Sequence, residues 1–212
     1  MKRNLILLYL LSMFFSCSAK EGIYPYFINQ LKEKVKVDVT CFDTVTRQNI
    51  TFVYPKIQQP MFDILLKVDI EHDMHDSNYE LSVITYSLKQ VSADFVSVLK
   101  SVYIANDGSA AGYSQWDEGL ILLRKDSDIY KIDLVFDQQT IDNAIEDAVR
   151  NQKIEEQCLK EDVAAIEYMS YYFEDGKLFI HNPVSYPTCW FDASLMFDSG
   201  NVIFIPIATS EK

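Results

Sequence analysis

The sequence predicts an α+β fold, in which hairpins build an antiparallel sheet and two or three helices accompany it. Three observations lead to this prediction. Apolar and polar residues alternate in many short runs, as in half-buried strands. Turn residues such as Asp175-Gly176 separate neighbouring runs. Helical spacing of apolar residues is confined to a few segments between the strands, and this segregation is typical of the α+β class.

The first half of the chain contains the clearest alternation. Val35–Phe42 is predicted to be a half-buried strand that turns its valines and Cys41 inward. The same pattern predicts three more strands, the second and third of which would pair across a polar connection: Asn49–Tyr54, Phe62–His72 and Tyr79–Leu88.

Helices are expected at three places. A short helix is expected around Tyr26–Glu33, and a longer one begins at Thr140 as its N-cap and runs to about Cys158. Apolar residues after Ser92 have helical spacing, so we expect a helix there, although several β-branched residues leave a strand as the alternative. Residues 106–116, rich in Gly, Ser and Ala, are expected to form a loop.

Three pairs of strands follow this loop. Each pair is separated by a turn rich in Asp, Ser or Gly, which are residues that tight turns favour. The predicted pairs are Leu120–Arg124 with Tyr130–Phe136, Ile166–Phe173 with Leu178–His181, and Trp190–Phe197 with Val202–Ile207.

The N-terminus has the features of an export signal. A basic start is followed by an apolar run from Leu5 to Phe15, which is too short to span a bilayer as a helix. Phe14-Phe15-Ser16-Cys17 resembles the lipobox of bacterial lipoproteins, and this resemblance implies that Cys17 is the lipid-attachment residue. The alternative is ordinary cleavage after Ala19, which would give a freely secreted protein.

These features define the expected domain organisation. Residues 1–16 would be the signal peptide, and residues 17–34 a tether with a short helix. Residues 35–212 would form a single α+β domain, with a subdivision near 106–116 as the alternative.

The net charge restricts the partners. The chain has 19 Lys and Arg against 31 Asp and Glu, a formal net charge of −12. Removing residues 1–16 would leave 17 − 31 = −14. Such an acidic protein is poorly suited to nucleic acid, and it would attach to a membrane through its lipid alone. We therefore expect a protein partner with a basic surface.

The remaining cysteines allow at most one disulfide. With Cys17 modified or removed, Cys41, Cys158 and Cys189 remain. In an exported protein, a pair of these cysteines would be oxidised to a disulfide. Cys41 is expected to be buried in its strand, which favours Cys158–Cys189 as the bridge; a pairing that involves Cys41 stays open as the alternative.

Two groups of residues are candidates for chemical or recognition sites. Glu71–Asp76 is the densest group of metal-ligating side chains, and His72, His75 and Asp76 would be its ligands if it bound a divalent ion; the alternative is a solvated turn. Tyr171, Tyr186 and Trp190 are candidates for a recognition surface, or alternatively for packing in a β-rich core. The sequence assigns no catalytic residue and no cofactor.

The last third of the chain resembles the extracytoplasmic C-terminal domain of the RsiV/PdaC type, which occurs in lysozyme-binding anti-sigma factors and peptidoglycan deacetylases. The resemblance implies an extracytoplasmic α+β binding domain, and no deacetylase catalytic residue can be placed in it. It rests on a strand, a helix, a hairpin and a final strand: Tyr130–Phe136, the helix from Thr140, Tyr168–Phe173 with Leu178–Ile180 across Asp175-Gly176, and Val202–Pro206.

Taken together, the residues predict an exported, lipid-anchored protein of the bacterial cell envelope that binds another protein without being an enzyme. An inhibitor or immunity protein for a basic cell-wall-active enzyme or toxin would fit. Two alternatives remain: a metal-dependent enzyme or metal-binding module that uses Glu71–Asp76, and a structural envelope protein.

Overall fold

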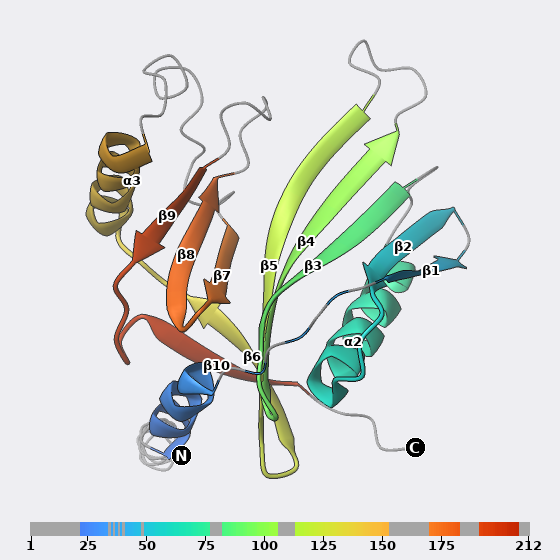
Figure 1. The fold of residues 1–212 in the computed structure, drawn as a ribbon, viewed down its shortest axis with the longest axis horizontal. Helices are drawn as coiled ribbons and strands as arrows, with labels where there is room; N and C mark the ends of the chain where they lie inside the picture. Colours follow the sequence, from blue (N-terminus) through green and yellow to red (C-terminus); the bar gives the residue numbers. More distant parts are fainter. Residues whose placement is uncertain are drawn as a thin grey trace, which may run out of the picture.

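The computed structural model confirms the α+β class and describes residues 22–33, 35, 37, 39, 41–47, 49–76, 82–105, 113–152, 170–182 and 191–207. Ten strands and three helices lie within these residues (Figure 1). In chain order they are the N-terminal helix (residues 22–32), β1 (Phe42–Arg47), β2 (Ile50–Pro55), α2 (Pro60–Asp76), β3 (Ser82–Val91), β4 (Phe95–Ala105), β5 (Tyr113–Lys125), β6 (Asp128–Leu134), α3 (Gln138–Gln152), β7 (Ser170–Glu174), β8 (Lys177–Asn182), β9 (Phe191–Leu195) and β10 (Val202–Ile207).

The strands form two sheets. The large sheet has the order β1-β2-β3-β4-β5-β6-β10, and the small sheet has the order β7-β8-β9. All neighbours are antiparallel except β2 and β3, which are parallel. Parallel neighbours cannot be joined by a tight turn, and the helix α2 supplies the crossover between them.

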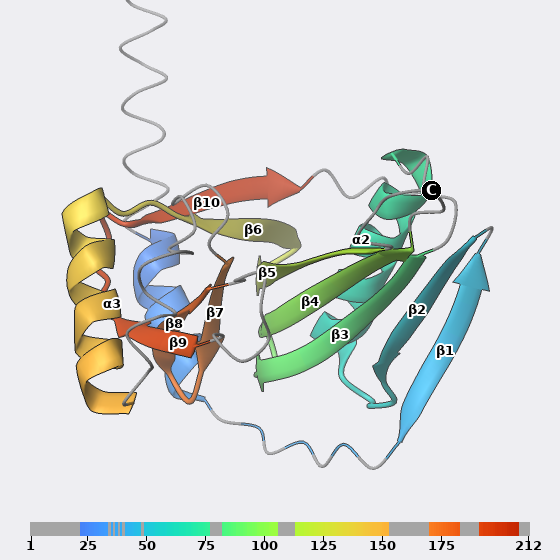
Figure 2. The same cartoon turned by 90° about the horizontal axis from the view of Figure 1, so that it is seen from above.

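The two faces of the large sheet have different coverings. One face is covered by α2 (Figure 2). Phe62 and Leu65 of α2 pack there against Ile84 of β3 and Val98 of β4, and all four side chains are buried. Each large apolar side chain buried in this way contributes roughly 1.5–3 kcal/mol. The opposite face is covered in part by the small sheet, whose strand β7 crosses β4 and β5.

The N-terminal helix is part of the second core. Ile23, Phe27 and Leu31 follow one another at intervals of four and lie on one buried face of the helix. The Phe27 ring lies 5.4 Å from Phe173 and 5.8 Å from Phe95, measured between centroids. The helix expected around Tyr26–Glu33 is therefore present over residues 22–32, and it packs as a core element.

The strand predicted at Phe62–His72 is wrong, because these residues belong to the helix α2. Phe62, Leu66 and Ile70 satisfy both a two-residue alternation and a four-residue helical repeat, so the pattern was ambiguous. Burial follows the helical repeat: Met61 and Leu65 are buried, whereas Ile64 is only half-buried. As a consequence β3 pairs with β2 and β4, and the pairing predicted for Tyr79–Leu88 is also wrong.

The helix expected after Ser92 is wrong as well, since β4 runs from Phe95 to Ala105. Val96 and Val98 face α2, while Phe95 and Leu99 face the small sheet, and all four side chains are buried. A central strand covered on both faces is apolar on both sides, so it loses the alternation by which a strand is recognised.

Three other predictions are corrected in part. β1 begins at Phe42, so the described residues of Val35–Phe42 do not form the predicted strand, and Cys41 is exposed. Residues 113–116 of the predicted loop belong to β5. The two last predicted strands exist, but β9 pairs with β8 and β10 with β6, so they form no hairpin with each other.

Local turn chemistry was predicted better. Asp126 at the β5–β6 turn has a φ of 58°, and Asp175 and Gly176 between β7 and β8 have φ values of 55° and 75°. The left-handed conformation in both turns suits tight hairpins. The helix expected from Thr140 is α3, although its cap is Asp137, whose Oδ1 accepts a hydrogen bond from the Thr140 amide at 2.8 Å.

Candidate functional site

A buried ionic cluster joins the two sheets. His181 lies on β8 directly opposite Asp192 on β9, and its Nδ1 is 2.7 Å from Asp192 Oδ1. The other ring nitrogen, Nε2, lies 2.8 Å from Oδ2 of Asp117, which belongs to β5 of the large sheet. His181 is 7% exposed, so its hydrogen bond to the buried Asp117 is shielded from water, whereas the Asp192 side chain is 42% exposed. We call these three residues the Asp–His–Asp bridge.

The electrostatics of the bridge favour a protonated imidazole. Burial alone would lower the pKa of His181, but the hydrogen bonds to Asp117 and Asp192 outweigh it and raise the pKa to about 9. Burial likewise opposes ionisation of Asp192, yet the hydrogen bond from His181 holds the pKa of this carboxyl below its usual value. At neutral pH, His181 therefore donates two charge-assisted hydrogen bonds and has no free lone pair with which to act as a base.

An aromatic ring and a lysine border the bridge. Tyr172 on β7 stacks on Phe179 with centroids 5.4 Å apart, and the Lys89 ammonium lies 4.5 Å from the Tyr172 ring centroid. Burial, followed by the charges of Asp192 and Glu174, raises the pKa of Tyr172. The positive charge of Lys89 also favours the ionised form of Asp192.

The close approach of β7 to β5 sets the position of the bridge. A Cβ added at Gly119 would lie 1.8 Å from the backbone oxygen of Tyr171, so a side chain at residue 119 would prevent this crossing. On either side of the crossing, Ser170 Oγ donates to the Asp117 backbone oxygen at 2.5 Å and the Phe173 amide donates to Ser97 Oγ at 2.8 Å. Backbone contacts thus fix the small sheet above the middle of β4 and β5.

Asp117 has one unused acceptor. Its side chain is 3% exposed, and its Oδ1 atom is buried without a hydrogen-bond partner in the described part of the structure. A buried carboxylate oxygen of this kind accounts for part of the energetic cost of the bridge. The geometry makes the bridge a structural connection between the sheets, with the charge of His181 compensating two carboxylates.

A second buried charge lies on the other face of the large sheet. Lys100 of β4 is 2% exposed, and its Nζ is 3.0 Å from Oδ2 of Asp69 on α2. The Tyr86 hydroxyl donates to the same carboxylate at 2.7 Å, and Glu118 is 3.7 Å from Lys100 Nζ. The largely buried pair of Lys100 and Asp69 holds α2 to the sheet, while the Glu118 side chain is 46% exposed.

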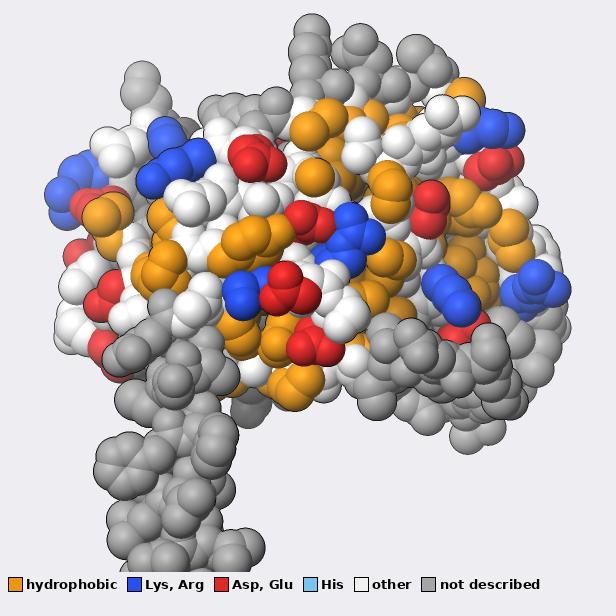
Figure 3. Space-filling view, turned by 90° about the horizontal axis from the view of Figure 1, so that it is seen from below, with side chains coloured by type: hydrophobic (Ala, Val, Ile, Leu, Met, Phe, Trp, Pro, Cys, Tyr) orange, Lys and Arg blue, Asp and Glu red, His pale blue; other side chains and the backbone are white. Residues whose placement is uncertain are grey.

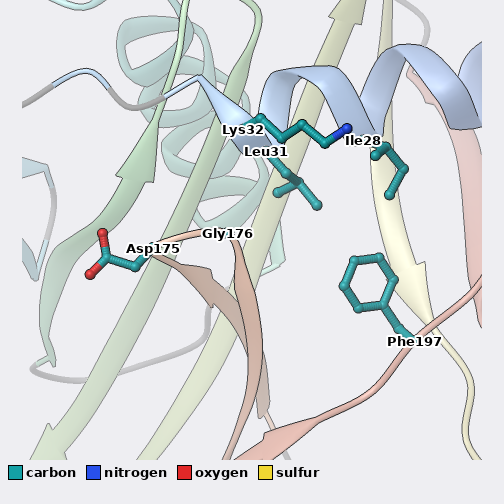
Figure 4. Close-up of a pocket in the computed structure, with 6 residues that line it drawn as sticks. All are labelled: Ile28, Leu31, Lys32, Asp175, Gly176 and Phe197. Carbon is teal, nitrogen blue, oxygen red and sulfur yellow. The ribbon is translucent and has the colours of Figure 1, made fainter.

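The structure also has a pocket of about 360 Å³ between the N-terminal helix and the β7–β8 turn. Ile28, Leu31 and Phe197 give it apolar walls (Figure 4). The Lys32 ammonium reaches its rim, whereas the Asp175 carboxylate points away from it (Figure 4). The volume is at the small end of the range for ligand pockets, and the walls lack the converging polar groups that orient a ligand.

The residues predicted as sites are only partly described. Tyr171 lies on β7 and is half-buried, with its ring 5.7 Å from Phe136. His72, His75 and Asp76 lie in α2, with side chains outside the described part. Five residues fall outside the described residues altogether: Cys17, Cys158, Cys189, Tyr186 and Trp190.

The sequence did not reveal the Asp–His–Asp bridge. One signal existed, because Asp117 is an acidic residue directly before the apolar run of β5 at a position that alternation turns inward. The pairing of His181 with Asp192 depends on the register between β8 and β9, which no local pattern fixes.

Comparison of the chain with protein-family models and with curated proteins finds no match. Among the described residues, no three His, Cys, Asp or Glu side chains form a group that could hold a metal ion. The helices of the described part are all too short or too polar to cross a membrane. Function must therefore be argued from the chemistry of the chain itself.

Proposed function

We propose that this chain is an exported, lipid-anchored protein of a bacterial cell envelope that binds a basic protein partner and is not an enzyme. The carrying observation is the excess of acidic over basic residues, and several basic side chains of the described part are already paired with carboxylates. Arg124 is paired with Asp94 at 2.7 Å, and Lys131 with Asp133 at 3.6 Å. The excess of acidic residues is thus left to determine the potential around the molecule.

Helix α3 illustrates this excess. Glu146 and Asp147 are both exposed on it, while Arg150, the basic residue in its last turn, is paired with Asp147 at 3.5 Å. Acidic surfaces accelerate association with basic partners and select against acidic ones. Many cell-wall-active enzymes are basic, which makes an inhibitor or immunity protein a fitting role.

The Asp–His–Asp bridge supports binding over catalysis. A general base needs a free lone pair, and a nucleophilic site needs an imidazole that can receive a proton. Both nitrogens of His181 are engaged by carboxylates, and the ring is shielded from solvent. The three residues are suited to hold two sheets in a fixed relation, as a binding scaffold requires.

The proposed membrane attachment has a direct test. Intact-mass analysis of the protein from the membrane fraction should give a chain that begins at Cys17 and carries the mass of a diacylglycerol group, and Cys17→Ser should abolish lipid processing. A mature N-terminus at Lys20 without added mass would refute lipidation and favour free secretion.

The proposed partner is tested with a basic wall-degrading enzyme. Immobilised mature protein is incubated with lysozyme at low and high salt, and retention and residual lysozyme activity are measured. Retention should fall steeply as salt rises, because screening weakens the attraction between surface charges. Glu146→Lys should weaken retention, whereas Glu146→Gln should weaken it less. The proposal would be contradicted if, at low salt, the immobilised protein retained neither lysozyme nor any basic protein from an envelope extract.

A further inference from the structure

One half of the large sheet has a broad face that no described helix or strand covers. This face lies opposite α2 and beyond the point where β7 crosses, and it spans β1 to β5. We call it the open face. Strand register and alternation place eleven residues on it: Phe42, Thr44, Thr46, Thr51, Val53, Val83, Thr85, Ser87, Ser101, Tyr103 and Gln115.

These side chains form rows across the strands. Thr46 pairs with Thr51, which pairs with Val83, and Val83 pairs in turn with Tyr103. The hydroxyl oxygens of Thr46 and Thr51 are 3.3 Å apart, which confirms that both side chains lie on the same side. Neighbouring strands are about 4.8 Å apart, so the rows form a regular grid.

The open face carries no charge within the described residues. Asp117 and Lys89 are the charged side chains next to the open face, and both lie at its border with the small sheet. Acidic residues of this chain are numerous elsewhere. A surface for a basic partner would be expected to present some of them. The absence of charge over five strands therefore indicates an uncharged ligand.

The chemical groups on the open face match a hydroxyl-rich ligand. Six of its residues are Thr or Ser, whose hydroxyls both donate and accept hydrogen bonds. Tyr103 is 39% exposed and Phe42 is 59% exposed, so aromatic surface is available beside the hydroxyls. Sugars combine hydroxyl groups at the ring edge with C–H groups on the ring faces, which pack on aromatic rings.

The other exposed apolar surface of the described part differs from the open face. On β10, Ile203 and Ile205 are 42% and 40% exposed, but they stand beside Asp133 and Lys131 of β6. Figure 3 shows the underside of the molecule, where apolar side chains are interspersed with acidic and basic ones. That surface has neither the hydroxyl grid nor the absence of charge.

We propose that the open face binds a neutral polysaccharide, with the Thr and Ser grid hydrogen-bonding to sugar hydroxyls and Tyr103 packing against a sugar ring. This ligand is distinct from the basic partner proposed above and binds by different forces. Because a neutral ligand gains nothing from the net charge, its affinity should change less than twofold between 50 and 500 mM NaCl.

The test is a calorimetric and NMR titration of the full mature chain with neutral tetrasaccharides of N-acetylglucosamine, glucose and mannose. At least one should bind and shift amide resonances of β2, β3 and β4. Tyr103→Ser and Ser101→Glu should each weaken binding at least tenfold, the first by removing the ring and the second by placing a charge in the grid. Ile205→Ser is the matched control, with nearly equal exposure on β10, and it should change affinity less than twofold.

A cationic probe separates this proposal from simple charge attraction. The tetramer of glucosamine, which lacks the acetyl groups, should bind in a salt-sensitive way that Ser101→Glu does not weaken. The proposal is overturned if none of the neutral tetrasaccharides binds. It is equally overturned if they bind but leave the β2–β4 amides unshifted, an observation on the wild-type chain that does not depend on whether a variant folds. Neither result bears on lipidation of Cys17 or on retention of lysozyme.

Discussion

The Asp–His–Asp bridge should make the stability of the protein depend on pH above neutrality. The pKa of His181 rises from an ordinary value of 6.5 to about 9 in the folded protein. At roughly 1.4 kcal/mol for each pH unit between the two pKa values, the difference corresponds to about 3 kcal/mol of folding free energy. This contribution is fully present below pH 6.5, declines between pH 6.5 and 9, and is lost above pH 9.

The Asp192 carboxylate should act in the opposite direction at low pH. The pKa of Asp192 is lowered in the folded state, so its contribution is present above its ordinary pKa and is lost as the pH falls through the folded value. The bridge is therefore strongest between about pH 5 and pH 6.5, the interval in which the imidazole is charged in both states and Asp192 is ionised.

Urea unfolding of wild type and His181→Gln at intervals from pH 6 to pH 9.5 measures the effect. The wild type should lose about 3 kcal/mol over this range relative to the variant, because tyrosine ionisation affects both proteins alike. His75→Gln, the control for loss of an imidazole elsewhere, should retain the slope of the wild type. Parallel curves for wild type and His181→Gln, or an NMR titration midpoint for His181 near 6.5, would refute the reasoning.

Three further substitutions test the packing. Gly119→Ala should destabilise the fold by at least about 3 kcal/mol in urea unfolding, since the new Cβ meets the Tyr171 backbone. The control is Gly22→Ala, whose Cβ meets no atom within 4 Å and which should be neutral or slightly stabilising. Lys100→Met should lower the free energy of unfolding by about 3–5 kcal/mol, because it leaves Asp69 buried beside an apolar group. Adding Asp69→Leu to this variant should restore more than half of the lost thermal stability. Gln90→Leu should cost about 2 kcal/mol, because the Gln90 amide bonds both Leu31 O and Gly176 N; an unchanged urea midpoint would contradict this.

The parts of the fold that depend on local chemistry were predictable from the sequence. Asp175-Gly176 identifies the β7–β8 hairpin because both residues must adopt positive φ, and few other pairs do so at low cost. The alternation of β2 identifies a strand covered on one face, with Ile50 and Phe52 buried and Thr51 half-buried. In both cases the determining contacts lie within a few residues of one another.

The errors share a different cause, which is the influence of distant segments. Residues 62–72 are apolar at alternate positions, yet they form a helix because β2 and β3 are parallel and need a crossover. Residues 95–105 form a strand because α2 and the small sheet cover both of their faces. Neither the parallel strand pair nor the covering elements can be inferred from the sequence of the segment itself.

The candidate sites likewise depend partly on local sequence and partly on distant segments. The open face follows from alternation within β1 to β5, but its extent depends on where the small sheet crosses, and Gly119 decides that position by admitting the Tyr171 backbone. The Asp–His–Asp bridge then fixes the small sheet at the border of the open face, since the buried Asp117 follows the exposed Gln115 on the same side of β5.

This arrangement connects the buried charges to the exposed surface. If His181 loses its proton or its side chain, two carboxylates face each other across the boundary between the sheets, and the small sheet loses a hydrogen-bonded attachment to β5 at the edge of the open face. The hydrogen bond from the Phe173 amide to Ser97 Oγ and the close approach at Gly119 remain, so the small sheet should stay attached while its outer end separates from the large sheet. A ligand that packs on Tyr103 would then meet a wider and more acidic border. The affinity of the open face for neutral sugars should accordingly fall as the pH rises through 9.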